Sequence, residues 1–458
     1  MNEFLFQYHR VHPTTWVYLS SLLTIAVYFK FSRLWSIRNA DLIGLILLAP
    51  GLLLVEYGFS MNIAHIEQTG FIWLFAMAAL FLFRLLVDQM MVRRPLLDPN
   101  VTVGGLTFVG ISLFLFLMAN VLNSSLSDEE LTGSRMAEQV SAQQEMQIAE
   151  NSLASHGPGY PPLFVLPRLL TQKIYERRGD QATDLGTARP TASQRKLVHI
   201  ATTRAMAIVS HLAIVIGMVF IGYRHFDNIK TGIAAATLYL LMPYTAQYTA
   251  RVDHVLPAAL LVCAIASYRR PTLAGMWMGL AMGVVYYPFF LLPLWFSFYW
   301  QRGLLRFTTG IVVALLILVA VLAVMADFQL DILLSNLRQM FGLRWPITEN
   351  MRGFWRFEGM VRDYRIPILA AFVVLSASFA IWPAQKNLGT LMSCSAAVML
   401  STQFWHAHGG GLYLAWYLPL LIMTIFRPNL EDRVALSVLG KGWFPGRRVS
   451  GPPVDQAA

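Results

Sequence analysis

Two neighbouring carboxylates, Asp128 and Glu129, lie a few residues beyond the end of a long apolar run. A carboxylate in that position could act as a general base or orient a hydroxyl group for attack. The flanking residues also allow a structural role, because Ser127 and Glu130 have the spacing of a helix capping box. We therefore predict Asp128 and Glu129 as catalytic candidates, with helix capping as the alternative.

Ionisable residues also stand where a later apolar run begins, at Arg251 and Asp253. Charges at such a depth are costly unless they pair with each other or face a polar cavity. Asp253 is thus a third catalytic candidate, and Arg251 is a substrate-binding candidate. A structural salt bridge that holds two helix ends together is the alternative.

A proline-rich motif runs from His156 through Tyr160 to Leu163. Because proline fixes φ and disfavours helix in the residue before it, the motif predicts a rigid turn with Tyr160 at the depth of a membrane interface. We count His156 and Tyr160 as substrate-binding candidates. A re-entrant loop with no catalytic role is the alternative.

The segment 327–365 combines arginines with aromatic residues. Arg352 and Arg356 are four residues apart and would share one face of a helix. Arginine forks suit phosphate oxygens, so these two residues are candidate ligands of a lipid phosphate. The acidic residues of the same segment offer a simpler alternative, in which the arginines are paired within the protein.

Metal-binding patterns are weak in this chain. His406 and His408 are two residues apart, precede a run of glycines and have no third ligand nearby in the sequence. Cys263 and Cys394 lie inside apolar runs, where a thiol behaves as a small hydrophobic group. The sequence predicts neither a metal site nor a disulfide.

The elements that must position these residues are membrane spans, because the composition is that of a polytopic membrane protein. The 458 residues are 56% hydrophobic and 13% charged, with 29 Phe and 12 Trp, and the mean hydropathy is +0.53. A soluble chain could not bury so much apolar surface. The net charge of +10 collects in short loops and the tail, which indicates topology and contact with anionic lipid and argues against nucleic-acid binding.

Apolar runs long enough to cross about 30 Å of hydrocarbon at roughly 1.5 Å per residue recur along the chain. Spans are helical because backbone amides find no partner in lipid. We predict an all-α fold, a polytopic transmembrane helical bundle of about 13 spans with a long extracytoplasmic loop after the fourth span. The longer spans are 14–31, 41–59, 70–90, 101–122, 204–223, 231–249, 306–326 and 366–382, and the shorter ones are 254–268, 272–300 as two spans broken at Pro288, 388–404 and 410–426.

Basic residues occupy every second short loop and the tail, whereas the alternate loops carry acidic residues such as Glu56 and Glu67. Cytoplasmic loops are the basic ones, so the N-terminus is predicted outside and the C-terminus in the cytoplasm. The second half of the 123–203 insert is basic and disagrees, but long loops are translocated largely regardless of charge. The predicted units are an N-terminal three-span module (1–100), a membrane core (101–426) with external segments 123–203 and 327–365, and a basic cytoplasmic tail (427–458).

The order of these features resembles the type C glycosyltransferase superfamily. In that superfamily a span is followed by a long external loop that opens with an acidic Asp-Glu motif, continues to a Pro-Pro-Leu turn and ends at a second span. The matching features here are the run 101–122, Asp128-Glu129, Tyr160-Pro161-Pro162-Leu163 and the run 204–223, followed by Ala250-Arg251-Val252-Asp253, Leu273-Ala274-Gly275, Tyr287-Pro288 and the terminal segment 413–420.

The resemblance implies an integral membrane enzyme that takes a sugar from a polyprenyl-phosphate carrier outside the cytoplasm. It implies Asp128 as general base, assisted by Glu129 or Asp253, and external arginines that hold the carrier phosphate. Tyr287 precedes Pro288 where many relatives have a lysine, and it is a further substrate-binding candidate. The implied partners are the carrier and membrane lipid, with no nucleic acid, and the only cofactor considered is a divalent cation.

Two other classes of function remain open. A lipid or solute transporter would need a polar path through the membrane, yet the span interiors carry almost no charge apart from Arg84 near one end and His211. A non-catalytic subunit of envelope assembly fits every feature except the coincidence of the acidic motif with the Pro-Pro motif. A transferase requires Asp128, Asp253 and an external arginine to line one cavity.

Overall fold

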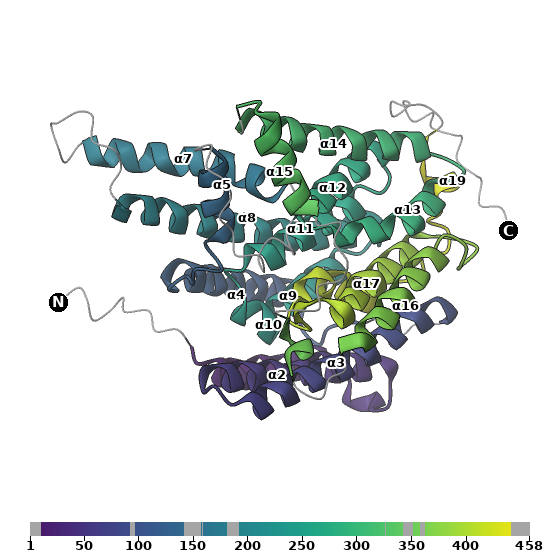
Figure 1. The fold of residues 1–458 in the computed structure, drawn as a ribbon. Helices are drawn as coiled ribbons and strands as arrows, with labels where there is room; N and C mark the ends of the chain where they lie inside the picture. Colours follow the sequence, from purple (N-terminus) through teal and green to yellow (C-terminus); the bar gives the residue numbers. More distant parts are fainter. Residues whose placement is uncertain are drawn as a thin grey trace.

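The protein is a bundle of helices that lie side by side, with α2 (Ile37–Ser60) and α3 (Ala64–Val87) at one edge and α14 (Leu304–Met325) at the opposite edge (Figure 1). The computed structural model describes residues 11–91, 97–141, 157, 159–180, 192–325, 327–341, 351–357 and 362–440. The only strands among these residues are β1 (Arg352–Gly353) and β2 (His408–Gly410), which pair in parallel. The predicted all-α helical class is confirmed.

Five of the described helices are long and apolar enough to cross a membrane, and three shorter apolar helices accompany them. Large apolar side chains on the outer faces, such as Phe83, Phe108 and Leu316, are exposed, as expected for surfaces that contact lipid. The chain is therefore a membrane protein. The larger number of about 13 spans stays a prediction. The five long helices are Ile37–Ser60, Ala64–Met90, Val103–Asn123, Gln194–His225 and Leu304–Met325.

The first four helices follow the predicted apolar runs closely. Side-chain caps define two of their starts, since Ser36 accepts from the backbone N–H of Asn39 and Thr102 accepts from that of Gly105. Glycine allows close packing in this region, because a Cβ added at Gly58 would lie 2.4 Å from the Glu67 backbone nitrogen. The bounds are α1 (Pro13–Tyr28), α2 (Ile37–Ser60), α3 (Ala64–Val87) with the 3₁₀ turn η2 (Asp88–Met90), and α4 (Val103–Asn123).

The insert after α4 contains helices α5 (Thr132–Ser141) and α7 (Tyr160–Asp180), and its last residues already belong to α8 (Ala192–His225). The predicted turn at Tyr160 is wrong, because α7 begins there. Prolines are tolerated in the first turn of a helix, where their missing N–H has no partner to lose. Just before α7, Gly157 and Gly159 donate backbone hydrogen bonds to Val284 and Gly283 at the end of α12 (Pro271–Val284), at 2.7 and 2.6 Å.

The second half of the bundle contains two predicted spans that are interrupted. The run 231–249 breaks at Pro243, and the helix predicted over 410–426 begins only at Leu418. Pro288 divides its run as expected. The elements are α9 (Ile229–Leu241), α10 (Pro243–Gln247), α11 (Val252–Ala266), α12 (Pro271–Val284), η3 (Tyr287–Leu291), α13 (Leu292–Tyr299), α14 (Leu304–Met325), α15 (Leu330–Phe341), η4 (Phe354–Arg356), η5 (Arg362–Tyr364), α16 (Arg365–Ser378), α17 (Leu388–Trp405), η6 (Leu414–Trp416), α18 (Leu418–Phe426) and α19 (Ala435–Val438).

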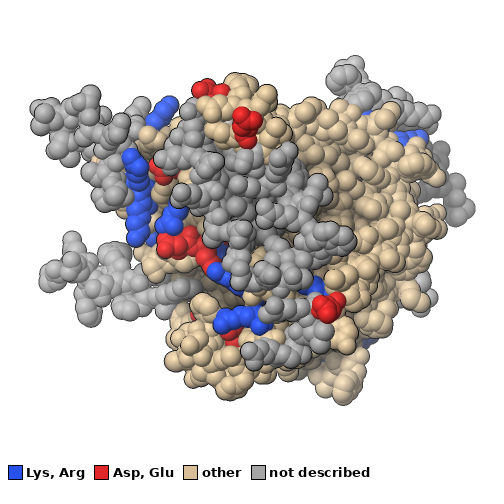
Figure 2. Space-filling view, viewed as in Figure 1, with Lys and Arg blue, Asp and Glu red and all other residues tan. Residues whose placement is uncertain are grey.

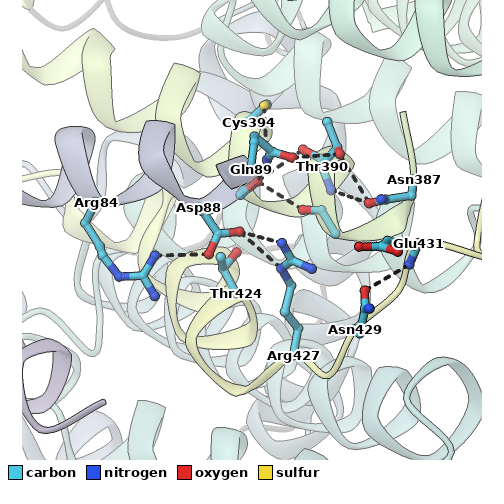
Figure 3. Close-up of polar contacts among 12 residues, drawn as sticks. Arg84, Asp88, Gln89, Asn387, Thr390, Cys394, Thr424, Arg427, Asn429 and Glu431 are labelled. Atoms are coloured by element: carbon cyan, nitrogen blue, oxygen red, sulfur yellow. Dashed lines mark hydrogen bonds and ion pairs between the residues drawn. The ribbon is translucent and has the colours of Figure 1, made fainter. Parts of the chain in front are cut away.

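A buried ion-pair network joins the N-terminal helices to the C-terminal ones (Figure 3). Asp88 has no exposed surface, and it receives Arg84 at 3.0 Å and Arg427 at 2.7 Å. Arg84 in turn forks onto Asp41 at 2.9 and 3.0 Å. These charges are compensated inside the bundle, so α2 and α3 are fixed to the segment that follows α18. The division of the chain at residue 100 stays a prediction.

We predict that Asp88→Asn destabilises the bundle, because two arginines would lose their shared counter-charge. Removing one partner of a buried pair costs about 3 kcal/mol or more. Thermal unfolding of the detergent-solubilised protein measures the effect. Asp227→Asn is the matched control, since Asp227 pairs with Arg433 at the surface and should cost less than about 1 kcal/mol. Equal unfolding temperatures for the two variants would contradict a structural role of the network.

Candidate functional site

A cavity of about 1130 Å³ is enclosed by segments that are far apart in the sequence. Its walls come from the ends of α2, α3 and α4, the turn before α5, the start of α11, β1 and the glycine-rich segment after α17. Figure 2 shows charged side chains of both signs mostly in the left and lower central parts of this face, beside a broad, largely uncharged surface at the right. The ionisable residues that line the cavity are Glu56, Glu67, Asp128, Glu129, Glu130, Tyr248, Arg251, Asp253, His254, Arg352, Arg356, His408 and Tyr413.

The best-defined contact in the cavity is the ion pair of Arg251 with Asp253 at the start of α11. The guanidinium donates two bonds, from Nε to Oδ1 at 3.1 Å and from Nη2 to Oδ2 at 2.9 Å. Burial alone would lower the pKa of Arg251, but the Asp253 carboxylate outweighs it and raises that pKa well above its usual value. Arg251 is therefore a permanent cation held in a fixed orientation.

Glu129 extends this pair into a chain of alternating charge. Its Oε2 accepts from Arg251 Nη1 at 3.2 Å, and its Oε1 accepts from Arg352 Nη1 at 3.1 Å. The side chains of Glu129 and Arg352 are 61% and 59% exposed, whereas that of Asp253 is only 12% exposed. Three of the segments singled out in the sequence thus meet through one carboxylate.

Asp128 lines the same cavity but lies at its exposed edge, with 85% of the side chain accessible. Its Oδ1 forms an ion pair with Arg135 of α5 at 2.5 Å. The capping-box contacts are also present, because the Ser127 backbone N–H donates to Glu130 Oε2 at 2.7 Å and the Glu130 N–H donates back to Ser127 Oγ at 3.4 Å. These two bonds close the turn at 128–131, and α5 begins only at Thr132, so they do not cap a helix that starts at Ser127.

Arg352 and Arg356 both line the cavity, but they do not share a helix face as predicted. Arg352 belongs to β1 and Arg356 to the 3₁₀ turn η4, because Gly353 between them has a φ of +75°. That conformation is open to glycine and strained for other residues. Glycine at this position also allows β1 to lie close to β2, since a Cβ at Gly353 would lie 2.8 Å from the Gly409 Cα.

Two acidic residues of the cavity, Glu56 and Glu67, were not selected from the sequence. Glu56 ends up beside the α10 helix, where its Oε2 accepts a hydrogen bond from Gln247. Both belong to the N-terminal helices that looked like an added module. The sequence could have indicated them, because both lie at the ends of apolar runs on the same predicted side of the membrane as the insert. The N-terminal helices therefore build one wall of the cavity.

Aromatic and histidine side chains form the base of the site behind Asp253. The Tyr244 hydroxyl hydrogen-bonds His254 Nδ1 at 2.5 Å, and the rings of His254 and Tyr413 are 4.4 Å apart. The Trp416 indole N–H donates to the backbone carbonyl of Asp253 at 3.1 Å. This packing fixes the first turn of α11, so the Asp253 carboxylate is held toward the cavity.

His408 is another cavity residue that the sequence did not select for binding. It pairs with Arg352 across the two short strands, and its backbone N–H donates to His406 Nδ1 at 3.0 Å. Burial lowers the pKa of His408, and the nearby cations Arg352 and Arg365 lower it further. His408 is therefore a neutral side chain at pH 7, able to donate a hydrogen bond from one ring nitrogen and accept one at the other.

Two predicted substrate-binding residues, Tyr160 and Tyr287, do not line the cavity. Tyr160 is buried, with its ring 5.0 Å from that of Phe164. Tyr287 is buried in an aromatic cluster, 5.0 Å from Trp416 between ring centres. His156 lies outside the described residues. The described part of the chain contains no group of three or more His, Cys, Asp or Glu side chains that could hold a metal ion.

Fold and site together define a helical membrane protein with a large cavity lined by alternating acidic and basic groups. Comparisons with protein-family models, with curated proteins and with solved structures give no match for this chain. The chemistry of the cavity must therefore be inferred from its own geometry. Arginines exposed in it can bind an anion, and carboxylates beside them can orient or deprotonate a hydroxyl group.

We predict that the cavity walls share one aqueous side of the membrane. Single cysteines placed by Glu56→Cys and Arg356→Cys should react with a membrane-impermeant thiol reagent from the same side of a sealed vesicle. Asp227→Cys, in the loop between α8 and α9, should react from the other side of the vesicle membrane. The native thiols Cys263 and Cys394 give the background, measured on the unmodified protein. Labelling of the first two cysteines from opposite sides would rule out a shared cavity.

Proposed function

We propose that the chain is a membrane glycosyltransferase that moves a sugar from a polyprenyl-phosphate carrier to an extracytoplasmic acceptor. One observation carries the proposal. Asp128 and Glu129, Arg251 and Asp253, and Arg352 and Arg356 come from three distant segments and line one cavity of about 1130 Å³. This combination of carboxylates and arginines is what transfer from a phosphate leaving group to a hydroxyl acceptor requires.

The two kinds of side chain have complementary tasks in such a reaction. The acceptor oxygen attacks the anomeric carbon, the bond from that carbon to the phosphate oxygen breaks, and the acceptor proton passes to a base. Arg352 and Arg356 would stabilise the charge that the phosphate gains as it leaves. Asp128, Glu129 or Asp253 would orient the acceptor and accept its proton, with inversion at the anomeric carbon.

The size and lining of the cavity suit a sugar with its phosphate. Its walls also include apolar side chains such as Val55, Phe59 and Phe71, which could contact the first units of a polyprenyl chain. The cavity belongs to a bundle whose outer faces carry exposed apolar residues, so a lipid-linked donor would reach it from the bilayer. A lipid carrier is therefore favoured over a soluble nucleotide donor.

We further propose a topology of about 13 spans, with the cavity outside and the C-terminus in the cytoplasm. Helix α2 begins near the basic loops, and Glu56 in its last turns lines the cavity. The basic loops contact one another at the other end, where Lys230 pairs with Asp98 at 2.7 Å and Arg433 with Asp227 at 2.6 Å. In this topology, the basic loops lie at one end of the bundle and the acidic loops at the other.

The proposal predicts loss of sugar from a polyprenyl-phosphate sugar when the wild-type protein is reconstituted in liposomes with a panel of such donors. Asp253→Asn should reduce turnover at least about a hundredfold, a typical size for loss of a general base or its equivalent. Asp128→Asn tests the assignment made from the sequence, and Asp227→Asn is the charge-matched control. Turnover of no donor by folded wild-type protein would favour the non-catalytic or transport alternatives.

A second prediction concerns the phosphate. Arg352→Gln should weaken binding of a short isoprenyl monophosphate about tenfold, because one charge-assisted contact is lost, and should leave binding of the matching isoprenol unchanged. Intrinsic tryptophan fluorescence in detergent measures both ligands. Arg433→Gln, at the opposite end of the bundle, is the control. Equal loss of affinity for the alcohol would show that the substitution acts through folding and not through phosphate contact.

A further inference from the structure

Glu129 makes two contacts that differ in kind from the ion pair of Arg251 with Asp253. Arg251 and Asp253 are two residues apart, form two bonds and are mostly buried. Glu129 makes one bond of 3.2 Å to Arg251 and one of 3.1 Å to Arg352, and both Glu129 and Arg352 are more than half exposed. An exposed single-bonded pair contributes little stability and exchanges readily.

The Glu129 carboxylate also occupies the position where an anionic ligand would bind. It lies between the guanidinium groups of Arg251 and Arg352, and both of these residues line the cavity. The phosphodiester of a polyprenyl-phosphate sugar carries one negative charge on two non-bridging oxygens, as a carboxylate does, so it can take the same place on an arginine fork. A ligand phosphate that reached Arg352 would therefore meet Glu129 as its competitor.

The backbone around Glu129 allows its side chain to leave without unfolding the turn. Ser127 and Glu130 hold the turn by their reciprocal hydrogen bonds, and Thr132 Oγ1 adds a bond to the Asp128 carbonyl at 3.2 Å. None of these contacts uses the Glu129 side chain. Arg251 also keeps its two bonds to Asp253 when Glu129 departs.

We propose that Glu129 is an internal substitute for the donor phosphate, displaced from Arg352 when the donor binds. The inference rests on the proposed function. Displacement frees the Glu129 carboxylate beside the newly bound donor, where it can orient the acceptor hydroxyl. Glu129 is thus a positioning residue that becomes available only after the phosphate is in place, which orders the binding of donor before acceptor.

Binding of a short isoprenyl monophosphate to the wild type, Glu129→Gln and Glu130→Gln tests the proposal. Glutamine at position 129 removes the competing charge, so the affinity should rise about two- to fivefold, the factor expected for an exposed ion pair. Glu130→Gln is the matched control, because it removes the same charge from the next residue and keeps the capping box, which accepts Gln. Its affinity should change less than about twofold.

Each outcome has a distinct meaning. An equal rise in both variants would reflect the general field of the cavity and would overturn the displacement. An unchanged or weaker affinity in Glu129→Gln would overturn it as well, and would leave the phosphate site intact. Binding of the phosphate no better than the isoprenol by all three proteins would instead defeat the proposed function.

Turnover provides a second readout that a purely structural role would not reproduce. In Glu129→Gln the donor KM should fall, because the competitor is gone, while kcat should also fall, because the freed carboxylate is missing. A variant that is merely destabilised would lose kcat without gaining donor affinity. Unchanged kcat and KM in Glu129→Gln would contradict the proposal.

Discussion

The ion pair of Arg251 with Asp253 is the contact on which the rest of the site depends. A charge near the end of an apolar helix is costly unless it is neutralised in place, and the two bonds between these side chains provide that neutralisation. With Arg251 fixed, Glu129 can reach it from the turn after α4, and Arg352 can join from β1. The insert and the segment after α15 are thereby brought to one cavity.

The same electrostatic constraint explains how the N-terminal helices belong to the site. Asp88 at the end of α3 is fully buried and is shared by Arg84 and Arg427, which ties these helices to the segment that follows α18. At their opposite ends the same helices bring Glu56 and Glu67 into the cavity wall. The ion pairs of Asp88 therefore position the N-terminal helices, and these helices in turn supply Glu56 and Glu67 to the charged lining of the cavity.

Short-range signals in the sequence were reliable where local physics decides the outcome. Apolar runs became helices, Pro288 divided its run, and Ser127 and Glu130 formed reciprocal hydrogen bonds, although these close a turn before α5. Such signals failed where the structural role of a residue depends on its position in an element or on the backbone conformation of its neighbours. The motif around Pro161 predicts a turn, but Pro161 stands in the first turn of α7. The four-residue spacing of Arg352 and Arg356 predicts a shared helix face, but no helix forms because Gly353 between them has a positive φ. Tyr287 was selected by its position in a motif, but packing buries it among aromatic rings.

The sequence by itself determined that this is a helical membrane protein and which carboxylates and arginines could do chemistry, because hydrophobicity and charge act residue by residue. Only the tertiary structure decided which of them meet. Glu129 contacts Arg251 and Arg352 across 122 and 223 residues, and no local pattern encodes such a distance. Glu56 and Glu67 joined the site for the same reason, since partners in an apolar bundle are set by how the helices pack.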